Sequence, residues 1–194
     1  TSDVLLTIKD FDTAFDEVTV AGVNAAITID RLMPPSTPPS QLVAIAGVDL
    51  GLPLTDGLVS MRLDRDGKPL VERSQWRWAG GKVATSMSRA DTTGETDLLV
   101  LEIDGIALDQ LLELTPQGSN IEATGSLFGR IPVVFRDGAF VIVDGWLESS
   151  FEGGEIRYTA DELAPGLLAG GEGVGLLLDA LDNFHYSRLR VDLA

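Results

Sequence analysis

Short segments of alternating apolar and polar residues, separated by glycine-containing dipeptides, run through most of this sequence. Two-residue hairpin turns need a positive backbone φ, which glycine adopts without steric cost and aspartate or asparagine tolerates. Parallel strands would instead need long crossover connections, usually helices. The turn signals therefore predict an antiparallel meander of strands. The dipeptides are Asp66-Gly67, Gly80-Gly81, Asp137-Gly138 and Gly153-Gly154.

The alternation assigns side chains to the two faces of the expected strands, because successive strand residues point to opposite sides of a sheet. Trp76 and Trp78 share one face, for example, while Arg77 between them lies on the other. Segments 97–103 and 131–143 are apolar on both faces. This second pattern predicts strands that are covered on both sides.

Helical periodicity is confined to two short segments. The first is residues 106–114, about two turns in which Leu108, Leu111 and Leu112 lie on one side. The second is residues 174–182, which also groups its leucines. We therefore expect a mainly β fold, an antiparallel meander sheet with two short α-helices.

A proline-rich segment, residues 33–39, cannot form a helix or a central strand, because proline lacks the backbone N–H that both require. It is either a linker or a rigid extended crossover. We expect N-terminal strands and this crossover in residues 1–40, and the antiparallel sheet with both helices in residues 41–194, as one continuous domain. The sequence does not start with methionine and stops within an alternating pattern, so we expect a fragment of a larger protein.

The charge balance excludes several classes of binding protein. Lysine and arginine number 14 against 30 aspartates and glutamates, which gives a formal net charge of −16. Such a chain lacks the clustered cations that bind nucleic-acid phosphates or anionic membrane surfaces. It contains no cysteine, so disulfides, thiolate catalysis and cysteine–metal sites are excluded. A hydrophobic fraction of 44% is nevertheless enough for a folded core.

The sequence offers no constellation of catalytic or metal-binding residues. His185 is the only histidine, so a zinc site or a serine–histidine triad lacks its partners. Acidic pairs such as Asp161-Glu162 fit turns and helix caps, and the glycine-rich segment 170–175 lacks the lysine of a phosphate-binding loop. We expect no catalytic residue, no metal, no cofactor and no enzymatic activity.

Large apolar side chains are numerous for a chain of this length. They form either an ordinary packed β core or the lining of a hydrophobic groove for an apolar ligand such as lipid acyl chains. Both interpretations remain open from the residues alone. The candidates for a groove are Trp76, Trp78, Met87, Phe128, Val133, Phe135, Phe140, Ile142 and Trp146.

Several motifs resemble the C-terminal region of YdbH-like proteins. Residues 108–112 fit a helix of the form L-x-x-L-L, and residues 124–132 fit the strand T-G-x-L-x-G-x-I-P that follows it there. The resemblance continues through 144–148, 153–158 and 180–189. Residues 22–42 also resemble the strand-and-proline segment that precedes these motifs in the family.

The resemblance implies a curved, groove- or taco-like sheet related to AsmA-like and TamB-like envelope proteins. It further implies a periplasmic segment of a protein anchored in the Gram-negative inner membrane, the anchor lying in the missing N-terminal part. Phospholipid would move between the inner and outer membranes along the groove. No catalytic residues are carried by that family.

Two alternatives stay open. The segment could be a structural or capping module that docks an outer-membrane protein or lipoprotein. It could also be a small-solute transport component, since the family also carries a dicarboxylate-transport label. A chain at −16 without an arginine cluster is a poor site for a dicarboxylate.

Overall fold

One antiparallel sheet dominates the computed structural model, which describes residues 3–15, 18–49, 53–89, 98–114, 121–136, 139–158 and 184–193. Within these ranges eleven strands form this sheet, and strands that follow one another in sequence are mostly neighbours in space. The order is β1 (Val4–Phe15), β2 (Val18–Ile29), β5 (Gln41–Asp49), β6 (Pro53–Leu63), β7 (Pro69–Trp78), β8 (Gly81–Arg89), β9 (Leu99–Ala107), β11 (Ser126–Arg136), β13 (Gly145–Ser149) and β16 (Arg190–Leu193), with β12 (Ala139–Ile142) paired to β11.

Two smaller sheets and one helix complete the described structure. The first small sheet contains β10 (Ile121–Ala123), β14 (Gly154–Tyr158) and β15 (Phe184–Tyr186), and the second contains β3 (Arg31–Leu32) and β4 (Pro35–Ser36). The helix is α1 (Leu108–Glu113). The structure confirms the mainly β, antiparallel fold.

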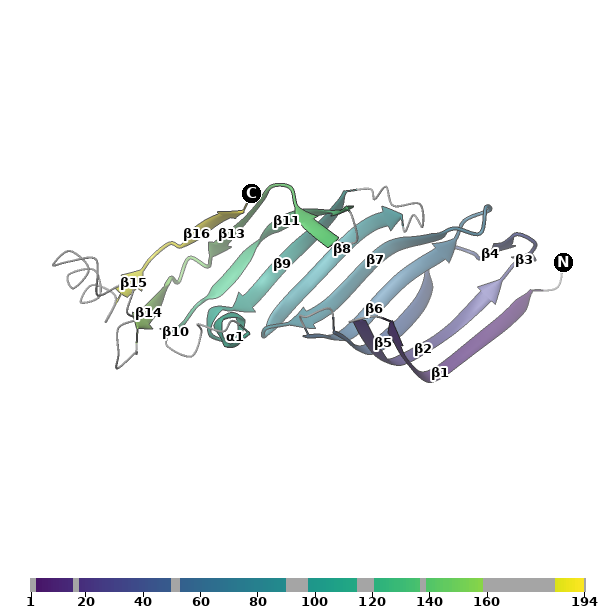
Figure 1. Ribbon diagram of the computed structural model, residues 1–194, viewed down its shortest axis with the longest axis horizontal. Helices are drawn as coiled ribbons and strands as arrows, with labels where there is room; N and C mark the ends of the chain where they lie inside the picture. Colours follow the sequence, from purple (N-terminus) through teal and green to yellow (C-terminus); the bar gives the residue numbers. More distant parts are fainter. Residues whose placement is uncertain are drawn as a thin grey trace.

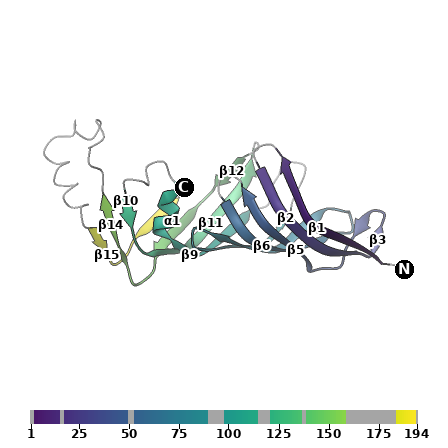
Figure 2. The same ribbon diagram turned by 90° about the horizontal axis from the view of Figure 1, so that it is seen from below.

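The large sheet is curved and not closed (Figures 1 and 2). Strands β1 and β16 lie at its opposite ends. In Figure 2 the ends of β1, β2 and β12 rise on the same side of the sheet as α1, so that the sheet forms an open trough. Strand β2 is hydrogen-bonded directly to β5, so the strands before and after residue 40 belong to one continuous sheet.

The first expected helix is shorter than residues 106–114, because Ile106 belongs to β9, where it pairs with Leu127. The second, residues 174–182, lies outside the described residues. The proline-rich segment contributes β4, which pairs with β3 just before the segment, and a hydrogen bond from Asp30 N to Ser36 O ties β4 to the end of β2.

The composition of segment 131–143 predicts a strand that is covered on both sides. The structure differs from this prediction. The segment contains the end of β11 and the whole of β12, and Val141, Ile142 and Val143 are 43%, 40% and 50% exposed. Within the described residues β12 pairs only with β11, so no second strand is hydrogen-bonded to its outer edge there.

The predicted hairpin turns are found in part. Gly67 has φ +76° in the turn between β6 and β7, as expected. The turn from β7 to β8 is centred one residue earlier than Gly80-Gly81, because Gly81 already pairs with Trp78. Residues 137–138 lie outside the described residues. Residues 153–154 do not form a hairpin, since β13 and β14 belong to different sheets.

Two glycines with positive φ, Gly80 and Gly105, differ in the space around an added Cβ, so their substitution distinguishes backbone strain from steric crowding. Gly105 has φ +69° with nothing within 4 Å of an added Cβ, whereas Gly80, with φ +75°, would place a Cβ 3.0 Å from Gln110 Nε2 and 3.2 Å from Ala107 Cβ. Gly105→Ala should cost about 1 kcal/mol from the left-handed conformation alone.

Gly80→Ala should cost more than Gly105→Ala, because the Gln110 side chain and Ala107 must also move by a few tenths of an ångström to make room for the new methyl group. Urea unfolding of both variants measures the difference. Equal losses of unfolding free energy would contradict the close approach of the β7–β8 turn to α1.

Candidate functional site

The strand register sorts the side chains of the large sheet onto two faces. Directly opposed residues of antiparallel strands point to the same side, and neighbours along a strand point to opposite sides. Ile45, for example, lies opposite Val23 of β2 and Gly57 of β6, while the adjacent Ala44 lies opposite Asn24 and Leu58. The same rule can be followed from β2 to β13.

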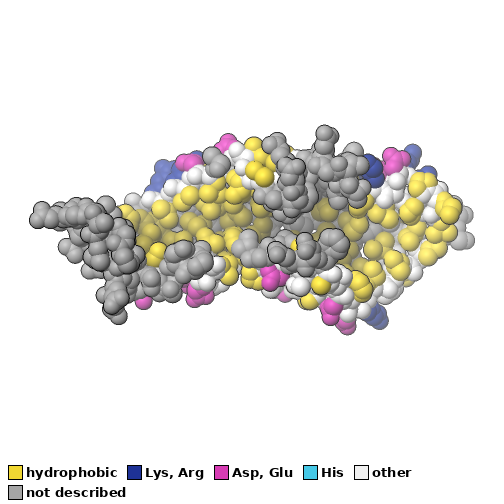
Figure 3. Space-filling view, in the orientation of Figure 1, with side chains coloured by type: hydrophobic (Ala, Val, Ile, Leu, Met, Phe, Trp, Pro, Cys, Tyr) yellow, Lys and Arg dark blue, Asp and Glu magenta, His cyan; other side chains and the backbone are white. Residues whose placement is uncertain are grey.

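One side, called here the apolar face, carries hydrophobic residues from strand to strand. It comprises Val23, Ala25 and Ile27 of β2, Val43 and Ile45 of β5, Val59 of β6, Trp76 and Trp78 of β7, Val83 of β8, Leu101 and Ile103 of β9, Ile131 and Val133 of β11, and Leu147 of β13. Figure 3 looks onto the hollow side of the sheet, where hydrophobic side chains form a band along its length.

The other side, called the polar face, carries most of the charge of these strands. It comprises Asn24, Ala44, Leu58, Ser60, Gln75, Arg77, Lys82, Ala84, Glu102, Asp104, Phe128, Arg130, Trp146, Glu148, Arg190 and Asp192. Ion pairs join neighbouring strands on it, such as Arg190 Nη1 to Glu148 Oε2 at 3.6 Å.

The polar atoms in the middle of the apolar face bond to one another. The hydroxyls of Ser74 and Thr85, both buried, are 2.9 Å apart, and Trp76 Nε1 donates to Ser74 Oγ at 3.2 Å. An unpaired polar group on an apolar surface carries a desolvation penalty. Because these polar atoms are bonded to one another, an apolar ligand could cover the middle of the apolar face without leaving them unpaired.

At one end α1 covers the apolar face. Leu111 packs against a cluster built on Val83, Ile103 and Ile106, and also against a second cluster that includes Leu108. Ile106 is only 2% exposed, so this end is a closed hydrophobic core. Trp78 also packs here, and its Nε1 is buried without a hydrogen-bond partner among the described residues.

Toward the other end the apolar face is open. Within the described residues, the two packed clusters include no side chain of β1, β2, β5 or β6. Ile45, Val59 and Trp76 are half-buried, and Val4 and Leu6 of β1 are 41% and 45% exposed. A contiguous apolar surface of this kind marks an interaction or ligand site. We call the open part, from β1 to β7, the apolar trough.

Of the nine groove candidates, four share a side of the sheet. Trp76 and Trp78 lie on the apolar face, and Val133, which is 5% exposed, lies opposite both Leu99 of β9 and Ile142 of β12. Met87, Phe135 and Phe140 belong to strands, but their side chains lie outside the described part of the chain.

Phe128 and Trp146 lie on the polar face, away from the other candidates. Trp146 pairs with Arg130 and Asp192, and the guanidinium of Arg190 lies 5.4 Å from the centre of its ring. Residue size suggested a groove position for both. Strand parity excludes it for Phe128, because an odd number of positions separates it from Val133 in one strand.

The apolar trough also contains residues that size alone did not single out. Val23, Val43, Ile45 and Val59 form much of its floor, and Val43 is 9% exposed. The available signal was the period-two alternation in 24–31 and 58–64, which places one apolar row on each strand.

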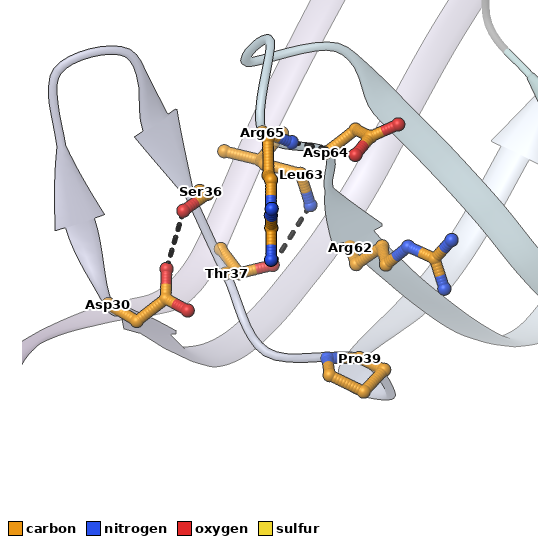
Figure 4. Close-up of a pocket in the computed structure, with 8 residues that line it drawn as sticks. All are labelled: Asp30, Ser36, Thr37, Pro39, Arg62, Leu63, Asp64 and Arg65. Carbon is orange, nitrogen blue, oxygen red and sulfur yellow. Dashed lines mark hydrogen bonds between the residues drawn. The ribbon is translucent and has the colours of Figure 1, made fainter.

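A polar pocket of about 280 Å³ lies at one rim of the sheet, between the β3–β4 pair and the end of β6 (Figure 4). Its walls are joined by hydrogen bonds from Leu63 N to Thr37 Oγ1 at 2.9 Å and from Ser36 Oγ to Asp30 Oδ1 at 2.6 Å. Ser36 and Thr37 are both 7% exposed. We call it the rim pocket.

Glu72 holds an arginine beside the rim pocket. Arg62 Nη1 lies 3.2 Å from Glu72 Oε1, and Ser60 and Ser40 also donate to this carboxylate. Partial burial alone would raise the pKa of Glu72, but these hydrogen bonds and the charge of Arg62 outweigh it and lower the pKa. The carboxylate therefore stays ionised at neutral pH and fixes the direction of Arg62.

His185 is exposed and lies 4.0 Å from Glu155 through its Nε2. The described residues contain no group of histidine, aspartate and glutamate side chains arranged to hold a metal ion. Nor does any helix among them have the length and hydropathy needed to cross a bilayer.

The model of the YdbH-like family, described as intermembrane phospholipid transport protein YdbH, matches residues 1–194, the whole of the chain. No curated protein and no solved structure matches it. The family is one of lipid transport rather than of enzymes. The chain therefore belongs to the YdbH-like family.

Proposed function

We propose that the apolar trough is a segment of the path along which phospholipid moves between the inner and outer membranes, in the periplasm. The observation that carries this proposal is the continuous apolar face of an open, curved sheet, in whose middle the polar atoms of Ser74, Trp76 and Thr85 bond to one another. Family membership supplies the cargo class, a phospholipid.

The chemistry of the trough suits acyl chains. Each methylene group removed from water contributes about 0.8 kcal/mol, so even partial cover along several strands retains a long chain. The open side lets a headgroup stay in water while the chains lie on the sheet. Movement of a lipid along the trough breaks no covalent bond, so the proposal needs no catalytic residue.

The dicarboxylate alternative has less support. The residues named above for the apolar face include no basic side chain, and the rim pocket is lined by two arginines and two aspartates, Arg62, Arg65, Asp30 and Asp64, whose formal charges cancel. A site for two carboxylates needs an excess of cations with free N–H donors.

A capping role has one specific observation in its favour. The α1 clusters close the apolar face at the β9–β11 end, with Leu108 8% and Leu127 3% exposed. We infer that the path ends or turns outward near α1. Docking of an outer-membrane protein or lipoprotein at this end would be the function of such a cap.

Photocrosslinking in cells tests the lipid path directly. We expect p-benzoyl-phenylalanine in place of Val59 to capture phospholipid, because Val59 lies half-buried in the trough. The same group in place of Leu58, its neighbour on the polar face, should capture about tenfold less, since that side faces water. The measurement is mass spectrometry of the crosslinked adducts.

Equal capture at Val59 and Leu58 would show non-specific contact and sink the conduit proposal. Lipid capture confined to positions near Leu111, with none at Val59, would favour the cap over the conduit. Both variants replace exposed or half-buried side chains, so their folds can be compared by circular dichroism.

A further inference from the structure

The rim pocket contains hydrogen-bond donors that have no acceptor among the residues that the structure describes. Figure 4 shows the Arg65 side chain extending toward Thr37, and its guanidinium has no hydrogen-bond or ion-pair partner among the described residues. Thr37 Oγ1 accepts its bond from Leu63 N, so the hydroxyl proton remains to be donated. A guanidinium and a hydroxyl that converge in this way fit an anionic oxygen cluster such as a phosphate.

An acceptor lies on the opposite wall. Asp30 uses Oδ1 to accept from Ser36 Oγ, and its Oδ2 has no partner within the described part of the chain. By contrast, Arg62 is held by Glu72, and Asp64 Oδ1 accepts from Arg65 N at 2.7 Å. Asp64, like Asp30, uses one oxygen in these bonds, but in Figure 4 its side chain extends away from Thr37. The groups that face the pocket together are therefore one cation, Arg65, and one anion, Asp30.

The pocket has a fixed frame rather than a loose surface. Arg31 joins its two walls, donating from Nε to Pro34 O at 3.2 Å and from Nη2 to Arg65 O. Thr37 N also donates to Leu63 O at 3.2 Å. The backbone that carries Arg65 and Thr37 is thus held in place before a ligand binds, which reduces the entropic cost of binding.

Apolar side chains adjoin the polar groups. Leu63 lines the pocket. Leu32, in β3, and Met33, which follows it, are 63% and 88% exposed. Strands β2 and β6, whose residues floor the apolar trough, both end at this rim. A polar site at the rim of an apolar trough matches the two parts of an amphipathic lipid.

We propose that the rim pocket binds the zwitterionic headgroup of a phosphoethanolamine lipid, with the phosphate against Arg65 and Thr37 and the ammonium against Asp30. This rests on the proposed lipid path and deepens it by naming the headgroup. A zwitterion fits better than an anionic headgroup, because the charges lining the pocket cancel and the whole chain carries a net charge of −16.

Soluble headgroups test the pocket without the trough. Glycerophosphoethanolamine should bind about tenfold more tightly than glycerophosphoglycerol or inorganic phosphate, as measured by calorimetry and by NMR shifts of Thr37 and Arg65. Arg65→Gln should weaken binding about tenfold, and Asp30→Asn, which keeps an acceptor for Ser36, should abolish the preference for ethanolamine. Arg73→Gln is the matched control, since Arg73 is exposed and does not line the pocket.

Equal binding of inorganic phosphate would reduce the site to a phosphate site and overturn the assignment, as would binding that Arg65→Gln leaves unchanged. A second arm uses detergent-solubilised phosphatidylethanolamine and phosphatidylglycerol. If both lipids are retained equally and Arg65→Gln changes nothing, the headgroup assignment fails while the lipid path stands. If neither lipid is retained but glycerophosphoethanolamine binds, the lipid path fails and the pocket stands.

Discussion

Ile45→Asp should reduce the phospholipid recovered with the purified protein about tenfold or more, because it places a carboxylate in the path of the acyl chains. Ile45 is half-buried on the apolar face between Val23 and Gly57, close to where the ring of Trp76 packs over Gly57. Acyl methylenes in contact with an ionised group lose the hydrophobic gain that holds them.

The matched control is Ala44→Asp. It adds the same negative charge one residue away, on the polar face, where Ala44 is exposed. It should leave lipid recovery unchanged, and Ile45→Leu, which conserves volume and polarity, should restore it. Lipid is quantified by mass spectrometry of extracts from protein whose thermal unfolding is measured in parallel. Equal lipid recovery from Ile45→Asp and Ala44→Asp would refute the apolar trough as the binding surface.

Ile106→Ala should lower the free energy of unfolding by about 3 kcal/mol, because the side chain is deleted from a core too well packed to collapse around the gap. Ile106 is 2% exposed and lies opposite Leu127, which is 3% exposed. The core beneath α1 combines the start of β8, the end of β9 and the start of β11, so the loss is felt across several strands.

Leu58→Ala provides the comparison, since Leu58 is 50% exposed and its truncation should cost less than about 1 kcal/mol. Urea unfolding monitored by tryptophan fluorescence gives both values. A loss for Ile106→Ala no larger than that for Leu58→Ala would mean that α1 does not close this end of the sheet, and the proposed cap would be lost with it.

Local pattern was sufficient for the strands and their antiparallel arrangement. The alternation around Trp76, Arg77 and Trp78 assigns faces that the register of β7 and β8 reproduces. Gly67 marks a turn for the same local reason, its positive φ. Such features depend on residues next to one another in sequence, so a single sequence contains the information.

Selecting groove candidates by side-chain size, without their place in the strand alternation, grouped residues that lie on opposite faces of the sheet. Phe128 and Trp146 were grouped with Val133 because all are large and apolar, yet the register puts the first two beside Arg190 and Glu148. A cation over the ring and an ion pair on the neighbouring strand make the polar face a favourable place for a tryptophan that is 38% exposed.

The sequence by itself determined a mainly β chain with one apolar row per strand and an acidic composition, because alternation, turn residues and charge are local properties. Only the tertiary structure decided that the rows join into one face, that α1 closes one end of it, and that Arg65, Thr37 and Asp30 meet at a rim. The physical reason is that strand register, β-bulges and the packing of α1 onto the sheet depend on contacts between residues far apart in sequence. A local sequence pattern does not determine the energies of such contacts.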